Sequence, residues 1–365
     1  PGSDIALYNA MLHVLLWEGL VDHEYIRAHT SGFEAQKEIA REYTPAAAAQ
    51  LCGVPAEDIV RAAKWFGACT PTLSLYCQGL NQSVHGTHNN AALINLHLAT
   101  GQIGKPGAGP FSLTGQPNAM GGREVGGMAN LLSAHRDLAN PAHRAEVARL
   151  WGVDWVPAEP GKTAVELFQA IEEGKIKAVW IACTNPAQSM PDQNLVRKAL
   201  ATAELVVLQE AYRNTDTAAY ADILLPASTW GEKAGTVTNS ERRISRVRAA
   251  VAPPGEARAD WEIVTDFARR LGAKLGDARA GRLFAYRTAE EVFNEHRETT
   301  RGRDLDISGL TYARLEAEGP QQWPLPEGAA GGAARLYTDG RFATADGRAR
   351  FAGVRHHDTA ERTDA

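Results

Sequence analysis

The chain lacks several features that would assign it at once to a common class of protein. Its 365 residues contain no run of lysine or arginine, and the formal net charge is −5. No apolar run is long enough to cross a bilayer. No GxGxxG or GxxxxGK[ST] pattern follows a predicted strand, which argues against an ordinary nicotinamide site or a P-loop. We therefore expect neither nucleic acid nor a membrane among the partners of this chain.

Cysteine and histidine do not occur in the arrangements that bind metals. The four cysteines are scattered, with no CxxC pair, at Cys52, Cys69, Cys77 and Cys183. This spacing predicts buried, reduced thiols in a cytoplasmic protein. His85 and His88 lie near each other but lack a third ligand, so we interpret them as loop or cap residues. We expect no metal ligand in this chain.

The remaining composition is that of an ordinary globular protein, 44% hydrophobic and 22% charged, with room for two or three domains. The chain opens on Pro1-Gly2-Ser3-Asp4, without a signal peptide or an initiator Met. These first residues are typical of the interior of a domain. We therefore expect the chain to be a piece of a longer protein.

Short apolar runs alternate with helical patterns in the second half of the chain. Aliphatic residues predict strands over 178–182, 205–208 and 223–225, with a helix over 165–172 before the first strand and one over 191–201 between the first two. This alternation is typical of βαβ units. We predict an α/β fold of mostly parallel, doubly wound sheets with helices on both faces.

The first half has helical periodicity over residues 5–29, with Asp4 as a candidate N-cap, and again over 89–100. Further helix starts are predicted at Thr44-Pro45 and at 54–57. The apolar run 73–77 predicts a buried strand that leads into a loop.

The stretch Ser112–Gly127, SLTGQPNAMGGREVGG, carries five glycines in sixteen residues and little that could fill a core. Glycine at this density suits backbone that turns sharply or approaches a ligand closely. The remaining side chains include donors suited to a polyanion, namely Ser112, Thr114, Gln116, Asn118 and Arg123. A solvent loop is the alternative. The apolar residues that precede the stretch favour a binding loop on a rigid scaffold.

Polar residues follow several predicted strands, and in a parallel sheet such strand ends meet at one edge. Asn185 and Gln209-Glu210 follow the first two strands, although Glu210 could instead begin a helix. Residues 230–243 are either a ligand loop or a solvated charged turn. Asp4 suits the adjacent donors of guanine, or caps a helix. The amides of 78–82 suit a flat heteroaromatic ligand.

These motifs together resemble the catalytic subunit of bacterial molybdopterin oxidoreductases, and specifically the assimilatory nitrate reductases. The matching stretches occur in family order: PGSDIAL (1–7), QGLNQSVHG (78–86), TGQIGKPGAGPFSLTGQPNAMGGREVGG (100–127), CTNPAQSMPD (183–192), ADILLPASTWGEKAGTVTNSERRI (221–244) and PPGEARADWEI (253–263). They cover about residues 1–270. The stretches 100–127 and 221–244 are the most specific, and the first indicates nitrate reductase within the superfamily.

The resemblance implies a molybdenum ion held by two molybdopterin guanine dinucleotides. It places cofactor contacts at Gly2, Ser3, Asp4, Gln78, Gln82, Asn185, Gln209, Glu210, Lys233 and Asp260. Two positions depart from the family pattern: Gln78 stands where Met is frequent, and Gln209-Glu210 where relatives carry Ser-Asp. Arg123 matches an arginine that lines the funnel to the metal, where a guanidinium would attract and orient nitrate.

The resemblance also implies an organisation for the chain. Residues 1–75 would be the C-terminal part of an inserted Rossmann-like domain, 76–275 the dinucleotide-binding domain, and 276–365 a helical or irregular extension. The family's amino-terminal domain with its [4Fe–4S] cluster, the cysteine that binds molybdenum, and the carboxyl-terminal domain are not matched by any part of this sequence.

The expected function is the two-electron reduction of nitrate to nitrite in the cytoplasm. Electrons would come from a ferredoxin, a flavodoxin or an NADH-linked reductase subunit. Two alternatives stay open: a formate dehydrogenase alpha subunit of the same superfamily, and a metal-free paralogue that acts as a structural or electron-relay subunit. For the assignment to hold, we expect the strand-end turns and the glycine-rich stretch to line one cleft shaped for two pterin dinucleotides.

Overall fold

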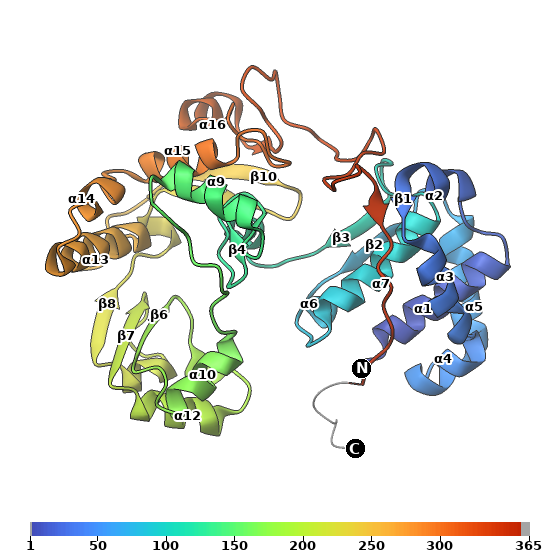
Figure 1. Ribbon diagram of the computed structural model, residues 1–365, viewed down its shortest axis with the longest axis horizontal. Helices are drawn as coiled ribbons and strands as arrows, with labels where there is room; N and C mark the ends of the chain where they lie inside the picture. The colour runs from blue at the N-terminus through green and yellow to red at the C-terminus, as the bar shows by residue number, and fades with distance from the viewer. Residues whose placement is uncertain (1, 359–365) are drawn as a thin grey trace. The chain divides into compact units, whose positions relative to one another are not determined.

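The chain divides into two compact units in the computed structural model, which describes residues 2–358 (Figure 1). Unit 1 comprises Pro1–Gln116 and Ala333–Ala365, and unit 2 comprises Pro117–Gly332. Pro1, the first residue of the matched stretch 1–7, lies outside the described residues, as does the end of the predicted extension. The division of the chain at residues 75 and 275 stays a prediction.

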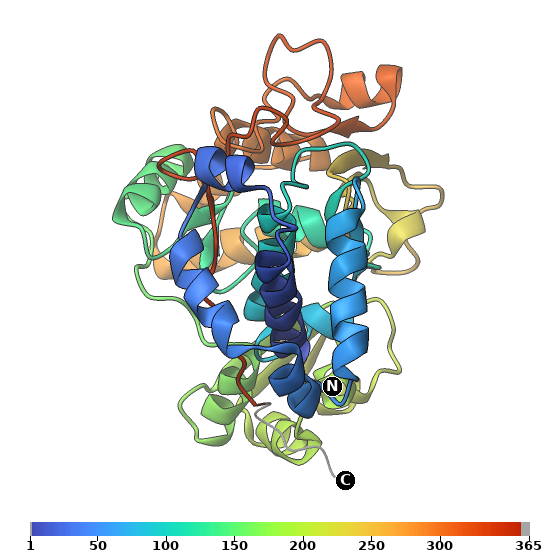
Figure 2. The ribbon, with the colours of Figure 1, turned by 90° about the vertical axis from the view of Figure 1, so that its right-hand side faces the viewer.

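Unit 1 is a layer of helices built around α1 (Asp4–Trp17). The other helices are α2 (His23–His29), α3 (Phe33–Glu42), α4 (Pro45–Cys52), α5 (Ala56–Ala68), α6 (Gln78–Asn81) and α7 (Gly86–Ala99). α1 contacts α3, α4, α5 and α7, as Figure 2 shows from the side of this unit. Leu12 and Leu15 of α1 pack with Leu93 and Leu96 of α7, and this burial stabilises the layer.

Two short parallel pairs complete unit 1. β2 (Leu73–Tyr76) pairs with β3 (Gly109–Ser112), and β1 (Thr30–Ser31) pairs with β12 (Ala349–Arg350). The segment after β12 stays on the helices, because Asn95 exchanges two hydrogen bonds with Ala352, at 2.9 and 3.1 Å. The last described part of the chain therefore belongs to the core of unit 1.

Unit 2 contains the parallel sheet predicted from the apolar runs. The strand order is β6 (Ala178–Ala182), β7 (Leu205–Glu210), β8 (Ile223–Pro226). α10 (Ala164–Glu172) and α12 (Gln193–Thr202) cover one face, where Ile181 and Leu208 are buried (Figure 1). Trp180 points to the other face and packs edge-on against Phe267 of α13 (Asp260–Leu275), with ring centroids 4.8 Å apart.

A second, antiparallel sheet lies in the same unit. β9 (Gly235–Thr238) and β10 (Arg243–Val247) form a hairpin, and β11 (Gln321–Gln322) pairs with β10. The Asn239 side chain accepts hydrogen bonds from two backbone amides of the turn, which closes the hairpin. The remaining elements are α8 (Ala119–Glu124), β4 (Leu131–Leu132), β5 (Arg136–Asp137), α9 (Pro141–Trp151), α11 (Pro186–Ser189), η1 (Asp216–Tyr220), η2 (Trp230–Glu232), α14 (Ala280–Leu283), α15 (Ala289–Thr299) and α16 (Tyr312–Glu318).

The predicted α/β class with mostly parallel pairing and helices on both faces of a sheet is confirmed, although the sheets are small. Several local predictions were wrong. The helix over 5–29 is two helices, and its N-cap is Ser3 while Asp4 is the first helical residue. The strand over 73–77 is not buried, because Leu73 and Leu75 have no covering element. The four cysteines are free, but none is buried. Residues 230–243, expected to be a ligand loop or a charged turn, contain the strand β9, and their contact with a ligand stays a prediction.

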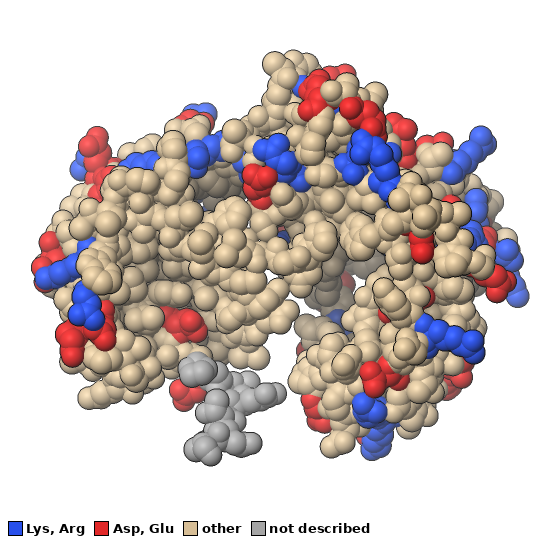
Figure 3. Space-filling model, turned by 180° about the vertical axis from the view of Figure 1, so that it is seen from behind, with Lys and Arg blue, Asp and Glu red and all other residues tan. Residues whose placement is uncertain are grey.

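No helix among the described residues is long and apolar enough to cross a membrane. On the face drawn in Figure 3, lysine and arginine side chains lie beside aspartate and glutamate side chains, with uncharged areas between them. Such mixing agrees with the small net charge.

Candidate functional site

The carboxyl ends of the parallel strands in unit 2 bring four polar side chains together around Asp260. Asp260 is the first residue of α13, and its carboxylate accepts hydrogen bonds from Gln209 at the end of β7, at 2.8 Å, and from Lys233 after η2, at 2.8 Å. The Cys183 thiol, directly after β6, donates to the same carboxylate at 3.3 Å. The predicted residues Gln209, Lys233 and Asp260 therefore form one cluster.

The cluster keeps Asp260 in its charged form. Burial by itself would raise the pKa of Asp260, but the hydrogen bonds from Lys233 and Gln209 and the charge of Lys233 outweigh that effect and lower the pKa. The Lys233 ammonium also lies over the Trp230 ring, 5.5 Å from its centroid. A carboxylate and an ammonium are thus held at the sheet edge.

Three polar atoms around this edge are buried and have no hydrogen-bond partner among the described residues: Gln209 Oε1, Thr215 Oγ1 and Ser228 Oγ. Thr215 and Ser228 follow β7 and β8, and Gln209 touches Asp260. Buried polar groups are normally paired, so unmet hydrogen-bonding capacity at one edge of a sheet is what a polar ligand would satisfy.

Asn185 is engaged within the loops of the same edge. Its side-chain oxygen accepts hydrogen bonds from the Thr217 backbone at 3.0 Å and from the Thr217 hydroxyl at 2.7 Å. Its amide nitrogen donates to Gln188 and Asp216. Asn185 therefore joins the loop after β6 to η1, and this side chain sets the shape of the edge.

Glu210 ends β7 and does not begin a helix. Its carboxylate accepts hydrogen bonds from the backbone amides of the next two residues, at 2.7 and 3.3 Å. These bonds close the turn after the strand. The ribose or guanine contact expected of Glu210 stays a prediction.

Arg123 lies on α8, within the stretch predicted from its glycines as a binding loop. Its side chain is exposed and, among residues 2–358, makes no hydrogen bond or ion pair. The next residue, Glu124, is only 3% exposed. The last turn of α8 therefore has one side chain, Glu124, in the interior and the preceding one, Arg123, in solvent. Among the described residues, all five N–H donors of the Arg123 guanidinium are unused.

The other candidates lie in unit 1. Gly2 has a φ of 80°, a conformation that favours glycine, and Ser3 and Asp4 lead into α1. Gln78 begins α6 and donates to Gln116 at 3.3 Å, and Gln82 is the C-cap residue that follows α6. No hydrogen bond between described residues joins Asp4 to this pair. Because the candidates divide between the two units, the single shared cleft stays a prediction.

The sequence analysis missed two participants. Cys183 was expected to be a buried thiol, but it is exposed and adopts a φ of 59°. Its place directly after an apolar strand and before Thr184-Asn185-Pro186 was the signal available. Glu124 was not singled out, because nothing in the order of residues shows that its carboxyl group is buried.

The Cys183 contact makes a prediction about reactivity. Although Cys183 is exposed as a residue, its thiol group is partly buried against Asp260. This partial burial, and then the Asp260 charge, raise the pKa of Cys183 to about 11. At pH 8 little thiolate is therefore present, and we expect iodoacetamide to modify Cys183 more slowly than the exposed Cys69. Peptide mass spectrometry over time measures both rates in one sample. Asp260→Asn should accelerate the reaction at Cys183 alone, whereas equal acceleration at both thiols would contradict the contact.

The donor set fits a large polar ligand better than a bare metal ion. Among residues 2–358 no group of three His, Cys, Asp or Glu side chains is arranged to hold a metal. The Asp260 carboxylate, the Lys233 ammonium and the unpartnered Gln209 oxygen suit a ligand that has donors as well as anionic groups. A nucleotide with its base and phosphates is such a ligand.

Comparison with known proteins agrees with this chemistry. A family model described as molybdopterin oxidoreductase matches residues 1–270. The chain is 45% identical to a nitrate reductase of Synechocystis sp. over 96% of the chain and 49% of that protein. It is 39% identical to the assimilatory nitrate reductase catalytic subunit of Bacillus subtilis, over 96% of the chain and 48% of that protein.

Two further matches carry other names. The F420-dependent formate dehydrogenase subunit alpha of Methanocaldococcus jannaschii is 39% identical over 100% of the chain and 51% of that protein. Among solved structures, acetylene hydratase from Pelobacter acetylenicus matches with a TM-score of 0.64 and 21% identity, over 96% of the chain and 48% of that protein, which shows the fold alone. The chain spans about half the length of the relatives it matches. It belongs to the molybdopterin oxidoreductase family.

Proposed function

We propose that this chain is the central part of the catalytic subunit of a nitrate reductase. The reaction takes up two electrons and two protons, so that nitrate gives nitrite and water. The similarity to the Synechocystis and Bacillus subtilis enzymes supports the substrate. The structural observation that carries the proposal is the exposed, unpaired Arg123 guanidinium at the end of α8.

The geometry of Arg123 suits nitrate for a physical reason. A guanidinium is planar and offers parallel N–H donors, and nitrate is a planar anion with oxygens spaced to accept two of them. Arg123 would attract the anion, orient it, and stabilise negative charge that develops on oxygen. Since no described carboxylate competes for its donors, the whole hydrogen-bonding capacity of the side chain is available.

The cofactor of this proposal is molybdenum bis(molybdopterin guanine dinucleotide). In unit 2, Gln209, Lys233 and Asp260 would hold it, with Asn185 and Glu210 shaping the same edge. In unit 1, the proposed contacts are Gly2, Ser3, Asp4, Gln78 and Gln82. When bound, the group supplies the two-electron redox chemistry. The residues of this chain supply position and charge.

The remaining parts of the proposal lie outside this chain. We propose that the complete protein also holds a [4Fe–4S] cluster and a molybdenum ligand, in segments that correspond to the parts of the relatives not covered by this chain. The electron donor would be a ferredoxin, a flavodoxin or an NADH-linked subunit. A cytoplasmic location rests on the similarity to the assimilatory enzyme.

A formate dehydrogenase alpha subunit is the second candidate. It is favoured by the Methanocaldococcus jannaschii relative, which matches along the full chain. Both candidates share the cofactor, so only the substrate separates them.

The test uses the complete protein that contains this chain. Molybdenum analysis and mass spectrometry for guanine dinucleotide should find both. Reduced methyl viologen should then be oxidised on addition of nitrate, with nitrite formed in a one-to-two ratio to viologen. Formate-driven viologen reduction in place of nitrate turnover would favour the second candidate. A protein that binds neither metal nor dinucleotide would be the non-catalytic paralogue.

A further inference from the structure

Hydrogen bonds join both ends of the short helix α8 to Thr238 of the hairpin. The Asn118 side chain, just before the helix, accepts a hydrogen bond from the Thr238 backbone amide at 2.9 Å. Glu124, the last helical residue, accepts one from the Thr238 hydroxyl at 2.8 Å. A helix of six residues is not stable alone, so these bonds fix its place.

Glu124 has a second anchor far away in the chain. Its other carboxyl oxygen accepts a hydrogen bond from the Trp323 indole at 2.5 Å, and all three side chains are buried. Burial raises the pKa of Glu124, and the bonds from Thr238 and Trp323 together with His135 offset only part of that rise. A buried carboxyl group without a direct ionic partner destabilises a fold unless its hydrogen bonds are kept.

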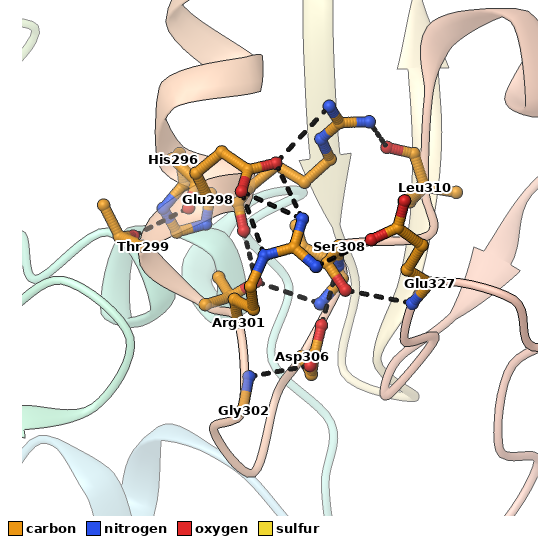
Figure 4. Close-up of polar contacts among 12 residues, drawn as sticks. His296, Glu298, Thr299, Arg301, Gly302, Asp306, Ser308, Leu310 and Glu327 are labelled. Atoms are coloured by element: carbon orange, nitrogen blue, oxygen red, sulfur yellow. Dashed lines mark hydrogen bonds and ion pairs between the residues drawn. The ribbon is translucent and has the colours of Figure 1, made fainter. Parts of the chain in front are cut away.

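The support beneath α8 is itself braced. A small cavity of about 60 Å³ under the helix is lined by residues that include Glu124, His296 and Ile307. Figure 4 shows how the segment that carries His296 is tied: Arg301 pairs with Glu298 at 3.0 Å, and further bonds close the following turn. The wall opposite α8 is therefore held in place.

These contacts at the end of α8 determine where Arg123 lies. It is adjacent to Glu124 in the last turn of α8, and its own side chain has no partner to hold it. The backbone of α8 thus sets the region that the guanidinium can reach. Any shift of the helix end would move the guanidinium with it.

We propose that Glu124 is a positioning residue for Arg123, and that it acts by clamping the end of α8 to Thr238 and Trp323. The inference rests on the proposed function, because it takes Arg123 to be the group that meets nitrate. Glu124 itself is buried and touches no substrate.

The test compares Glu124→Met with Glu124→Gln in the complete molybdenum-loaded enzyme. Methionine keeps the volume but removes both acceptors. Glutamine can accept from Trp323 and donate to the Thr238 hydroxyl, so it keeps both contacts. We expect Glu124→Met to raise KM for nitrate about tenfold with a smaller change in kcat per molybdenum, and Glu124→Gln to restore the wild-type KM.

Hydrogen exchange provides a readout that needs no turnover. Peptides over residues 118–127 should exchange faster in Glu124→Met and at the wild-type rate in Glu124→Gln. Glu204→Met, at an exposed glutamate of the same unit, is the matched control and should change neither quantity. If Glu124→Met does not fold, Thr238→Val replaces it, because this variant removes one hydroxyl and leaves the backbone bond to Asn118.

Each result decides the proposal. A wild-type KM in Glu124→Met, in spite of faster exchange over 118–127, would show that the position of α8 does not matter for nitrate. Equal damage by Glu124→Gln would mean that charge, not clamping, is required. If the wild-type enzyme does not reduce nitrate at all, the proposed function fails, while the exchange rates still establish whether Glu124 holds α8.

Discussion

Arg123→Ala is expected to lower kcat/KM for nitrate by about 10²- to 10³-fold, while the molybdenum content stays at the wild-type level. Removal of one donor aimed at developing negative charge lowers the rate by about this factor, and we expect it here once the bound cofactor and the rest of the protein cover the guanidinium. Because Arg123 is exposed and bonds to no described residue, its loss leaves no buried partner unsatisfied. We expect the thermal stability to be unchanged, which separates this variant from a folding defect.

Two companion variants sharpen the Arg123 experiment. Arg123→Lys keeps the charge but not the planar pair of donors, so it should fall between wild type and alanine. Arg287→Ala removes an exposed arginine elsewhere in unit 2 and should behave as wild type. Steady-state kinetics normalised to bound molybdenum measure all three. Loss of metal in parallel with activity would mean that Arg123 holds the fold or the cofactor instead of the substrate.

Asp260→Ala should deplete the purified protein of molybdenum and guanine dinucleotide. The carboxylate pairs with Lys233 at 2.8 Å, and both side chains are partly buried. Removal of one partner of such a pair costs about 1 to 2 kcal/mol, between the exposed and the buried case, which corresponds to roughly five- to thirtyfold weaker binding. Lys233 and Gln209 would lose the group that holds them. We therefore expect loss of the cofactor before loss of the fold.

The control for this experiment lies on the same helix. Asp266 of α13 also forms ion pairs, with Arg258 and Arg270, but no hydrogen bond between described residues joins it to Gln209, Lys233 or Cys183. Asp266→Ala should keep the cofactor content of the wild type. Metal analysis, nucleotide release and circular dichroism of both variants give the comparison. Equal depletion in both would assign the effect to α13 as a whole, and Asp260 would no longer be a specific contact.

The lowered pKa of Asp260 predicts that the stability of the fold depends on pH. Because the pKa of Asp260 is lower in the folded chain than in a free aspartate, the group stabilises the fold above the unfolded pKa. That contribution is lost as the pH falls through the folded pKa. As the pH falls through that range, the free energy of unfolding should therefore decrease more steeply for wild type than for Asp260→Asn, which urea unfolding at a series of pH values measures.

The sequence predicted the parts of the fold whose signal is local. The runs at 178–182 and 205–208 are strands with Ile181 and Leu208 buried. A short apolar run flanked by amphipathic helices is buried when it pairs in a sheet that those helices cover. Thr44 caps the helix that begins at Pro45, as its side-chain chemistry requires. Gln209, Lys233 and Asp260 meet because parallel strands end on the same side of a sheet.

The parts that were missed depend on residues distant in the chain. The hairpin residues Thr236 and Arg246 are polar, so no periodicity distinguished these strands from a charged turn. Glu124 is buried only because Trp323, 199 positions later, covers it. Leu73 and Ile223 are apolar but exposed, since burial requires a neighbour as well as an apolar side chain.

The discontinuity of unit 1 has a consequence for synthesis on the ribosome. Unit 2 is one uninterrupted stretch and can finish folding as soon as its last residue has emerged. Unit 1 cannot finish folding at that point, because Phe351 and Val354 fill its interior. In addition, β1 pairs with β12, which is translated over three hundred residues later. The early helices must therefore remain incompletely packed while the inserted unit is translated, and during that interval their apolar surface is open to aggregation.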